Sequence, residues 1–403
     1  MLKLKAVVWS CLLLVLVWGC GGRAVQSSKR TVPEQRIAGK FISQPSSSLE
    51  RVPSGSIPSL ADDLDVASLS LAIERSLQYF SRFDDRDVYY VGARPSTVGE
   101  TEETLKAFRD IVSGPDSAQI KQQKIRDTFD FYKSRGDDNK GRVIFTGYYE
   151  PVLNGSLIKT TQYQYPLYRT PEETVVLNAG KSVGRMVKGE TLPHYKRAEI
   201  DGAKLLAGRN LEIVWVDDLI DLFFLQIQGS GKVRLPDGKL VQVGYAQSNG
   251  YPYRSIANYM LDKGLLSKSE ISQQAIKKYL RAHPDEVERI FNYNERYVFF
   301  RLLEKGAIGS LGIPVTGGRT IASDPAVFPK GALALIRTRK PLLDNGEVVK
   351  WITFSRFVVN QDTGAAINGA GRIDLFCGGG AEAADIAGRL KEEGELVFLL
   401  KKK

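Results

Sequence analysis

Cysteine and histidine are scarce in this chain, and their scarcity excludes much of the chemistry of metal and thiol enzymes. Among 403 residues there are 3 cysteines and 2 histidines. Neither His194 nor His283 belongs to an H-E-x-x-H motif or lies beside a cysteine pair, so no zinc site is predicted. No G-x-S-x-G turn supplies a serine nucleophile. Nothing close in sequence would activate the thiol of Cys377, and we expect a buried small residue there.

Long hydrophobic runs are also rare, and the one near the N-terminus is too short to span a bilayer. The stretch AVVWSCLLLVLVW follows the basic sequence MLKLK, as in a secretory signal peptide. It ends at Val17–Cys20, which resembles a bacterial lipobox, and Gly21 and Gly22 resemble lipoproteins sorted to the outer membrane. We expect a signal peptide over residues 1–19 and a lipidated Cys20 that anchors the protein to the periplasmic face of the outer membrane. An ordinary cleaved signal is the alternative.

The same expectations account for the cysteines. Cys11 would leave with the signal peptide and Cys20 would carry lipid, so that only Cys377 remains. No intrachain disulfide can then form, and the exported protein must depend on its own hydrophobic core. With 43% hydrophobic residues, the chain is large enough for such a core, which we expect to be divided between two domains.

The charge is unbalanced toward positive, with a formal net charge of +10 and an isoelectric point near 9.3. A nucleic-acid-binding protein is one interpretation, but the basic residues are spread along the chain and do not alternate with aromatic residues as in a binding platform. An acidic polymer or an anionic membrane surface fits the charge equally well, as does a merely basic soluble protein. We expect no nucleic-acid partner.

The N-terminal part is predicted to be a tether followed by helices. Residues 20–70 are rich in Ser, Pro, Gly and charge, which is typical of a flexible segment. Apolar residues at helical spacing predict three helices, over 66–80, over 103–112 and between Asp116 and Gly136. The last of them would place Ile125, Phe129 and Tyr132 on one face.

From Arg142 the pattern changes to the shorter period of β-strands. Strands are predicted over 142–153, 211–216, 222–228, 232–235, 239–247, 319–324, 331–338, 351–362, 372–376 and 395–400. Pro236–Gly238 is a predicted hairpin turn. Helices are predicted over 271–282, 284–291 and 381–394. Ser267 and Glu270 form a predicted capping box for the first of them, and the many short strands with long connections favour β-barrels.

Three aspartates in apolar or glycine-rich surroundings are candidate acids. A carboxyl group can protonate a glycosidic oxygen near neutral pH only if burial raises its pKa. Asp374 has the most apolar neighbours, in RIDLF, although Arg372 would oppose the effect if its side chain turned inward. Each aspartate also has a structural interpretation: Asp324 can fix a turn before a proline, Asp362 can form an Asx-turn, and Asp374 can cap a strand end.

Tyrosine, glutamine, asparagine and serine gather in three stretches that suit a sugar polymer, which are 145–151, 225–231 and 245–256. Aromatic faces stack on pyranose rings, and amides and hydroxyls bond ring hydroxyls and N-acetyl groups. Loops stiffened by tyrosine and glycine are the alternative for any one stretch. Three stretches in one chain favour a glycan-binding groove.

Ordered motifs along most of the chain resemble those of the membrane-bound lytic murein transglycosylase A family of bacterial lipoproteins. The motifs are IFTGYYEPVL, LFFLQIQGSG, YAQSNGYPYRSI, YVFFR, GSLGIPVTGGRTIASDPAVFPKGAL and VVNQDTGAAINGAGRIDLFCGGG. The resemblance implies a mainly β fold with helices, in which a double-psi β-barrel is formed by 71–154 and 303–403. It also implies a second, β-barrel-like, glycan-binding domain inserted over 155–302, with a cleft between the two.

The resemblance also implies which residues act. The family's essential acid matches Asp374, and Asp362 matches a supporting carboxylate of the catalytic site. Matches to further family motifs imply substrate-binding roles for Thr146, Tyr148, Gln228, Ser230, Asn249, Arg254 and Asp324.

The implied reaction is cleavage of the β-1,4 bond between N-acetylmuramic acid and N-acetylglucosamine in peptidoglycan. Asp374 would protonate the leaving oxygen and then take the proton of the muramoyl C6 hydroxyl, which attacks C1 and closes a 1,6-anhydro ring. Because this nucleophile belongs to the substrate, no second catalytic carboxylate is needed, nor any metal or cofactor. The implied partners are glycan strands and, through Cys20, outer-membrane lipid, for a monomer that can join a cell-wall synthesis complex.

Two other functions fit the same sequence. A noncatalytic peptidoglycan-binding envelope lipoprotein would keep the tyrosine- and glutamine-rich loops but would not need Asp374. A glycoside hydrolase would use Asp374 together with Asp362 or Asp324. The ends of the glycan fragments distinguish the three functions: a lytic transglycosylase leaves anhydro ends, a hydrolase leaves reducing ends, and a binding protein leaves no fragments.

Overall fold

The structure is a computed structural model that describes residues 45–177, 182–268, 270–304 and 306–403. The expected signal peptide, Cys20 and the first part of the tether lie outside the described residues. No helix within the described ranges is long and apolar enough to cross a membrane.

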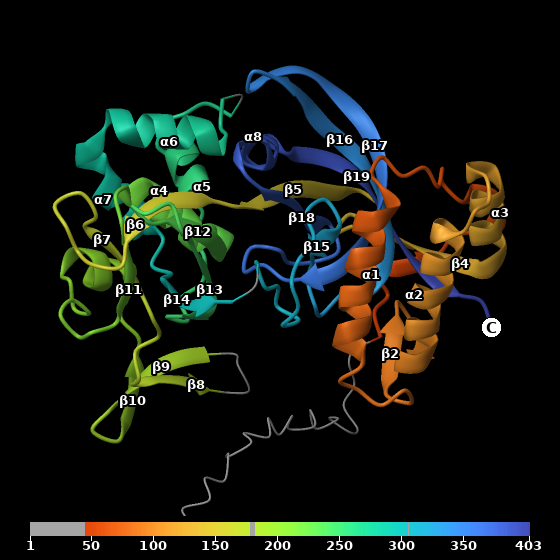
Figure 1. The fold of residues 1–403 in the computed structure, drawn as a ribbon, viewed down its shortest axis with the longest axis horizontal. Helices are drawn as coiled ribbons and strands as arrows, with labels where there is room; N and C mark the ends of the chain where they lie inside the picture. Colours follow the sequence, from red (N-terminus) through yellow and green to blue (C-terminus); the bar gives the residue numbers. More distant parts are fainter. Residues whose placement is uncertain (1–44, 178–181, 269, 305) are drawn as a thin grey trace, which may run out of the picture. The chain divides into compact units, whose positions relative to one another are not determined.

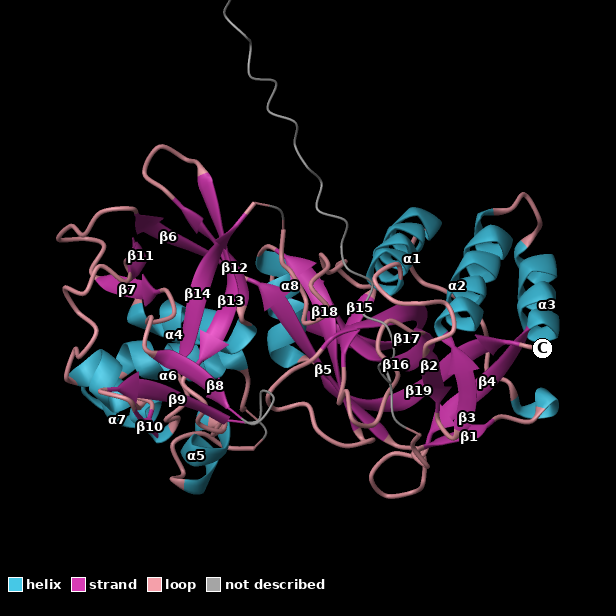
Figure 2. Ribbon diagram, turned by 90° about the horizontal axis from the view of Figure 1, so that it is seen from below, coloured by secondary structure: helices cyan, strands magenta, loops and turns pink. Residues whose placement is uncertain are grey.

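The larger sheet closes into a six-stranded barrel (Figures 1 and 2). Its strands are β5 (Val143–Glu150), β15 (Thr320–Ala322), β16 (Leu333–Asp344), β17 (Glu347–Asp362), β18 (Arg372–Gly379) and β19 (Lys391–Lys401). They follow the order β19-β16-β17-β15-β18-β5, and β5 pairs again with β19 to close the ring. The largest hydrophobic cluster fills this barrel and the helices beside it. The expected mainly β fold with a barrel is confirmed.

The segment before the first long helix is ordered from residue 45, which differs from the expected flexible tether. Here β1 (Leu49–Arg51) pairs antiparallel with β4 (Phe129–Ser134), and a 3-10 turn follows at Ser54–Ser56. Asp62 then forms an ion pair with Arg319, whose side chain is 0% exposed. Polar residues in this segment neutralise buried cations of the barrel. The segment is therefore docked on the barrel, although its composition is typical of a disordered chain.

Three helices lie together beside the barrel: α1 (Val66–Phe80), α2 (Val98–Ser113) and α3 (Ala118–Thr128) (Figure 2). Asp65, Thr97 and Ser117 cap their N-termini with side-chain oxygens, as short polar residues do at this position. Helix α1 contacts β17, α2 contacts β19 and α3 contacts β4. Along the chain, a small hairpin of β2 (Val88–Val91) and β3 (Arg94–Thr97) lies between α1 and α2.

The predicted continuation of the third helix beyond residue 128 is wrong. The chain turns at Phe129 into β4, which pairs with β19 on one side and β1 on the other. Phe129 and Phe131 are both buried on the core side, at the alternation of a strand rather than the spacing of a helix. The two apolar periods overlap in so short a segment, and pairing with the C-terminal strand decides between them.

A second, six-stranded sheet is formed by the middle of the chain in the order β14-β13-β12-β6-β11-β7. Its strands are β6 (Val152–Ser156), β7 (Tyr165–Tyr168), β11 (Glu212–Val216), β12 (Ser230–Arg234), β13 (Leu240–Ser248) and β14 (Val298–Leu303). The predicted hairpin is confirmed, because β12 and β13 pair from Arg234 and Leu240 across Pro236–Gly238. Among the described pairings none joins β7 to β14, but residues of these two end strands lie close together, so the sheet has the expected barrel-like form without a closing ladder.

Smaller elements complete the middle of the chain. They are the three-stranded sheet β8 (Thr174–Leu177), β9 (Ser182–Val187) and β10 (Glu190–Pro193), the π-helical turn Ala198–Gly202, α5 (Ile256–Asp262), α6 (Gln273–Ala282), the 3-10 turn Pro284–Glu286 and α7 (Val287–Tyr293). The restart at Pro284 is confirmed. The predicted capping box is wrong, since Ser272 caps α6 and Ser267 instead donates a hydrogen bond to Glu270. After β18, the helix α8 (Ala381–Arg389) leads into β19.

The predicted strand over 222–228 is also wrong, because this segment is part of helix α4 (Leu219–Gln228). Asp218 caps its first turn by accepting hydrogen bonds from two backbone N–H groups, and Gly229 ends it at φ +78°. The run LFFLQ (222–226) is buried nearly all round, between the second sheet and helices α5 to α7. A short continuous apolar run has no period that separates a buried helix from a buried strand.

Candidate functional site

Asp374 lies on β18, with β15 on one side and β5 on the other. Its directly paired neighbours are Ala322 and Thr146. Ile373 and Leu375 point into the barrel core, where they are 0% and 3% exposed, so Asp374 points to the outer face. Burial there raises the pKa of Asp374 to about 6, mainly because the charged form loses solvation. The acid is therefore poised for proton transfer close to neutral pH.

Thr146 and Arg372 set the hydrogen bonding of this acid. The Thr146 hydroxyl donates to Asp374 Oδ1 at 2.8 Å, and Arg372 Nη2 donates to the same hydroxyl oxygen at 3.3 Å. The Thr146 hydrogen bond and the positive charge of Arg372 both lower the pKa of Asp374, but by less than burial raises it. Arg372 Nε is buried without a hydrogen-bond partner among the described residues. Because Thr146 occupies Oδ1, the titrating proton of Asp374 belongs on Oδ2.

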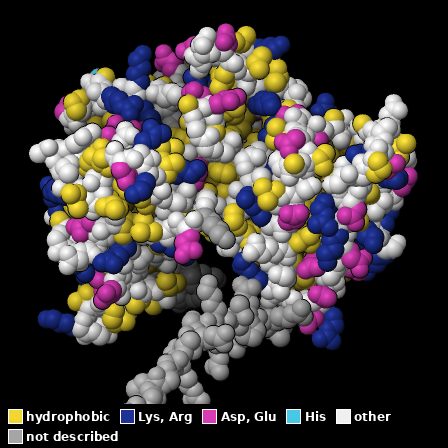
Figure 3. Space-filling model, in the orientation of Figure 1, with side chains coloured by type: hydrophobic (Ala, Val, Ile, Leu, Met, Phe, Trp, Pro, Cys, Tyr) yellow, Lys and Arg dark blue, Asp and Glu magenta, His cyan; other side chains and the backbone are white. Residues whose placement is uncertain are grey.

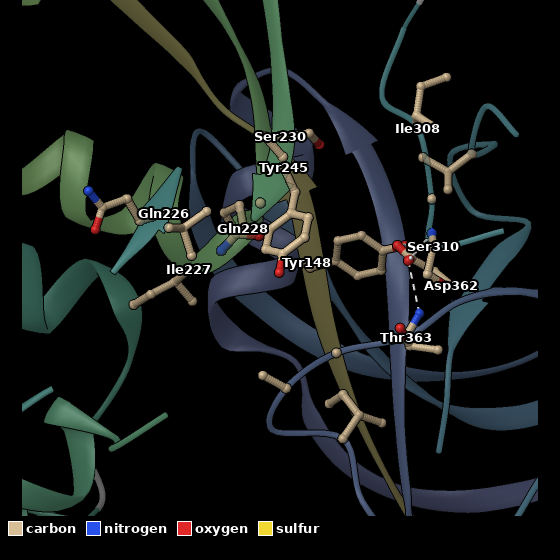
Figure 4. Close-up of a pocket in the computed structure, with 18 of the residues that line it drawn as sticks. Tyr148, Gln226, Ile227, Gln228, Ser230, Tyr245, Ile308, Ser310, Asp362 and Thr363 are labelled. Atoms are coloured by element: carbon tan, nitrogen blue, oxygen red, sulfur yellow. Dashed lines mark hydrogen bonds between the residues drawn. The ribbon is translucent and has the colours of Figure 1, made fainter. Parts of the chain in front are cut away.

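Asp362 lies at the end of β17 and has both carboxylate oxygens engaged (Figure 4). The Tyr148 hydroxyl donates to Oδ2 at 2.8 Å, and the backbone N–H groups of Ser310 and Thr363 donate to Oδ1 at 2.8 Å each. Burial raises its pKa, while these hydrogen bonds act in the opposite direction. The carboxylate therefore holds Tyr148 and the loop at 310 in place.

Two adjoining cavities run along these residues and form one groove between the barrel and the second sheet. The first, of about 580 Å³, is lined by Asp374, Thr146 and Arg372 from the barrel and by Tyr253 and Arg296 from the opposite wall. The second, of about 670 Å³, contains Asp362 and is shown in Figure 4. Both include Tyr148, Gln226, Ile227, Gln228, Arg296 and Val298 in their walls.

Most of the predicted site residues meet in this groove. Thr146 and Asp374 line the first cavity, Ser230 and Asp362 line the second, and Tyr148 and Gln228 line both. Gln228, at the end of α4, also accepts a hydrogen bond from the backbone N–H of Tyr149 at 3.0 Å. It therefore ties the second sheet's helix to barrel strand β5.

Asn249 lies outside the walls of both cavities. Its side chain is buried, at 1% exposure, and its amide donates to the carbonyl oxygens of Tyr195 and Glu295, at 2.9 Å each. Its oxygen accepts from the backbone N–H of Tyr297 at 2.8 Å. These contacts brace the backbone that leads into the groove, so Asn249 supports its shape from behind.

Arg254 and Asp324 also lie outside both cavity walls. Arg254 is half-exposed and forms an ion pair with Glu295 at 3.5 Å. Asp324 accepts hydrogen bonds from the backbone N–H groups of Ala326 at 2.9 Å and Gly369 at 2.8 Å. The turn-fixing interpretation of Asp324 thus matches its contacts, and it holds the loop before β18 next to the one after β15.

Comparisons with known proteins agree with this arrangement. A family model described as "MltA specific insert domain" matches residues 144–301, and one described as "3D domain" matches residues 319–400. The membrane-bound lytic murein transglycosylase A of Escherichia coli strain K12 is 31% identical over 311 residues, which cover 76% of this chain and 78% of that protein. This chain belongs to the membrane-bound lytic murein transglycosylase A family. The resemblance inferred from the motifs is confirmed.

Solved structures of the family share the fold. The membrane-bound lytic murein transglycosylase from Agrobacterium tumefaciens superposes with a TM-score of 0.73 at 28% identity, covering 88% of this chain and 98% of that one. E. coli MltA with bound chitohexaose gives a TM-score of 0.68 at 26% identity, covering 92% and 98%. Among the relatives compared by sequence, the membrane-bound lytic murein transglycosylase A of Vibrio cholerae is 30% identical over 265 residues, which cover 65% of this chain and 66% of that protein.

Cys377 and His194 lie outside the walls of both cavities. Burial raises the pKa of Cys377 to about 12, which keeps its thiol protonated, and Cys377 packs against Tyr149 and α8 as a small residue. Burial lowers the pKa of His194, which lies against Phe299. Among the described residues no group of His, Cys, Asp or Glu has the arrangement of a metal site.

Several groove residues of this family member were missed from sequence. Ser310, Arg296 and Lys391 line the two cavities, and Tyr253 lies opposite Arg372. Tyr253 falls within the aromatic stretch 245–256, whose composition was the available signal. Lys391 enters the site through the pairing of β19 with β5, which composition and local period do not reveal.

Proposed function

We propose that this chain is a lytic transglycosylase that cleaves the β-1,4 bond between N-acetylmuramic acid and N-acetylglucosamine in peptidoglycan and leaves 1,6-anhydromuramic acid ends. Membership of the family supports the reaction class. The observation that carries the proposal is the position of Asp374: its buried carboxyl group, with a pKa raised to about 6, lines a cavity of about 580 Å³. A noncatalytic binding protein has no use for an acid in this state.

In the first step Asp374 is the general acid. Its proton, on Oδ2, passes to the glycosidic oxygen as the bond to muramoyl C1 breaks, while Thr146 holds Oδ1. The resulting carboxylate then accepts the proton of the muramoyl C6 hydroxyl as that oxygen attacks C1. One proton leaves Asp374 and one returns, so the acid is regenerated at the end of each turnover.

The supporting residue Asp362 is proposed to act through Tyr148 rather than on water. Both of its oxygens accept hydrogen bonds, from Tyr148 and from the backbone N–H groups of Ser310 and Thr363. A hydrolase needs a second carboxylate that is free to act on a water molecule or on C1. The engagement of Asp362 therefore favours the intramolecular nucleophile. Thr146, Tyr148, Gln228 and Ser230 are the proposed glycan contacts.

The proposed division of labour follows the two sheets. We propose that residues 71–154 and 303–403 make up the catalytic barrel domain, with the docked segment from residue 45 added, and that residues 155–302 make up the glycan-binding insert; the two boundaries fall within β6 and at the end of β14. We propose that Cys20 carries lipid and holds the enzyme, as a monomer, on the periplasmic face of the outer membrane. The "membrane-bound" names of the relatives support the membrane association. Loss of palmitate labelling in Cys20→Ala tests the lipidation.

Digestion of purified murein sacculi tests the reaction. Fragments are separated and their ends identified by mass, and the proposal expects anhydro ends only. Reducing ends would instead indicate a two-carboxylate hydrolase. The absence of any fragments from folded wild-type protein that binds the sacculi would indicate a noncatalytic peptidoglycan-binding lipoprotein.

A further inference from the structure

The cavity that contains Asp374 is strongly cationic. Its lining includes Arg197, Arg296, Arg372 and Lys391, and Asp374 is the one carboxylate among the described residues that line it. A neutral glycan gives no reason for this charge. Figure 3 shows Lys and Arg interspersed with Asp and Glu over the visible outer face, so the excess in the cavity differs from the surface around it.

Arg197 is accounted for by the fold. It forms an ion pair with Asp201 at 3.0 Å, and its other nitrogens donate to Gln226 and to the carbonyl oxygens of Asn294 and Arg296. The other three cations differ: among the described residues, no carboxylate oxygen lies within 4.0 Å of a side-chain nitrogen of Arg296, Arg372 or Lys391. The charge of Arg372 also acts on Asp374, whereas those of Arg296 and Lys391 are left for a ligand.

Lys391 is placed beside the catalytic acid by strand register. In β5, Thr146 pairs with Asp374 of β18 on one side and with Lys391 of β19 on the other. Directly paired residues share a face of the sheet, so the three side chains form one row across three strands. At a strand spacing of about 4.8 Å, the Lys391 backbone lies roughly 10 Å from that of Asp374. Lys391 is exposed and reaches into the same cavity.

Arg372 lies two residues before Asp374 and therefore on the same face of β18. Its Nη2 donates one hydrogen bond to Thr146. Its Nε is buried and has no hydrogen-bond partner among the described residues. Arg296 approaches from the opposite wall, where its Nη1 donates to the carbonyl oxygen of Tyr251 at 3.1 Å. Cations thus flank the reacting position from both walls of the groove.

We propose that Lys391, together with Arg372 and Arg296, binds the carboxylates of the stem peptide carried by the muramoyl residue, so that peptide-bearing glycan is cleaved in preference to bare glycan. The inference rests on the proposed function and deepens it. The muramoyl lactyl group carries a short acidic peptide, whereas an N-acetylglucosamine polymer carries no charge. Carboxylates are the natural partners of unpaired guanidinium and ammonium groups in a partly buried site.

The test compares kcat/KM on three substrates: peptide-bearing strands, strands stripped by an amidase whose freed lactyl carboxylates are then capped as methylamides, and peptide-bearing strands whose stem carboxylates are capped as methylamides. Wild-type protein is expected to prefer the first by about tenfold, since electrostatic complementarity supplies selectivity of this order. The capped strands should behave like the stripped ones. Raising the ionic strength from about 0.01 to about 1 M shortens the Debye length from about 30 to about 3 Å and should reduce the preference.

Lys391→Met keeps the aliphatic stem and removes the charge. It is expected to lower the ratio of kcat/KM on peptide-bearing over stripped strands by about threefold or more, and Lys391→Arg should restore it. Lys350→Met is the matched control, because Lys350 is exposed on β17 and lies outside both cavity walls. A ratio within about twofold of wild type in Lys391→Met, or equal cleavage of all three substrates by wild-type protein, overturns the inference and leaves the proposed function intact. Cleavage of none of them overturns the proposed function itself.

Discussion

At the scale of single residues, the proton on Asp374 is controlled by opposing influences. Burial raises its pKa, whereas the Thr146 hydrogen bond and the charge of Arg372 lower it, for a value of about 6. The neighbouring Asp362 adds a further small rise through charge repulsion. Activity that requires the protonated acid should therefore decline as the pH rises through about 6 in the kcat/KM profile.

Arg372→Gln should move that decline to higher pH. Without the guanidinium the carboxylate is less stabilised, so the pKa rises further and the acid stays protonated over a wider range. The measurement is the pH profile of kcat/KM on peptide-stripped glycan, which separates this effect from stem binding. Arg372→Lys keeps the charge and should leave the decline of kcat/KM near the pH at which it occurs in the wild type. If the decline of kcat/KM in Arg372→Gln stays at the same pH or moves to lower pH, the charge of Arg372 does not lower the pKa of Asp374.

Asp374→Asn should stabilise the fold at alkaline pH. Since the folded pKa of about 6 lies above the unfolded value of 3.8, the folded state binds the proton more tightly, and stability falls as the pH rises from about 4 to about 6. At pH 8 the wild type carries this penalty in full, about 1–3 kcal/mol, and the neutral amide removes it. Thermal unfolding should show a gain in Tm at pH 8 that shrinks at pH 4. An equal difference at both pH values would count against a raised pKa.

Asp374 can be identified from the sequence because its neighbours Ile373 and Leu375 are apolar, and these residues do face the core. The opposing effect considered for Arg372 is present, because Arg372 lies on the same face of β18 as Asp374 and its charge lowers the pKa of that carboxyl group. Asn249 and Asp324 lie in the same motifs as groove residues, yet they bond backbone groups. A motif indicates that a segment borders a site, but which side chain faces the ligand depends on the path of the backbone.

At the scale of elements, strand β5 is the connection between the two sheets. It carries Thr146 and Tyr148 into the groove, and Gly147 between them faces helix α8. A Cβ added at Gly147 would lie 2.7 Å from Ala387 Cα and 3.0 Å from Cys377 Sγ. The close approach of α8 to β5 therefore requires the glycine and fixes the strand's position.

Gly147→Ala should lower the free energy of unfolding by roughly 1–3 kcal/mol, because helix backbone at this distance cannot move aside as a flexible side chain would. Urea denaturation measures the change, and kcat/KM should fall with it because the residues on both sides belong to the site. Gly55→Ala is the control, since a Cβ there meets nothing within 4 Å. Equal free energies of unfolding for the two variants would show that α8 can move away from β5 at little cost.

The elements that sequence predicted wrongly have a common physical cause. The run at 222–228 and the segment after Thr128 are both short, and their apolar residues fit a helix or a strand locally. Contacts distant in sequence decide: α4 is surrounded by the second sheet and the helices after it, and β4 pairs with the C-terminal strand. Segments with a capping residue and a full amphipathic period, such as α1 and α2, were predicted within a few residues.

At the scale of the whole molecule, the chain before α1 is part of the barrel domain. Asp62 neutralises Arg319, which is 0% exposed, and accepts a hydrogen bond from the backbone N–H of Phe357. Asp63 binds Arg356 and Lys340 on adjacent strands. The composition of this segment gave no sign of these partners, because they lie more than 250 residues away in sequence.

Asp62→Ala should destabilise the protein by about 2–4 kcal/mol, because it leaves the buried guanidinium of Arg319 without its counter-charge. Denaturant unfolding measures the loss, and Glu74→Ala, at an exposed position of α1, serves as the control. A loss no greater than that of the control would mean that the segment from residue 45 is only loosely attached.

The central claim is that Asp374 is the acid and base of the bond cleavage. The most direct test follows the release of anhydro-ended fragments from murein sacculi by wild type and by Asp374→Asn, with binding to the same sacculi measured in parallel. The amide should reduce the rate at least about 100-fold, as the loss of a general acid does, while binding stays within about threefold. A variant that binds and still releases anhydro ends at a rate close to that of wild type would contradict the account.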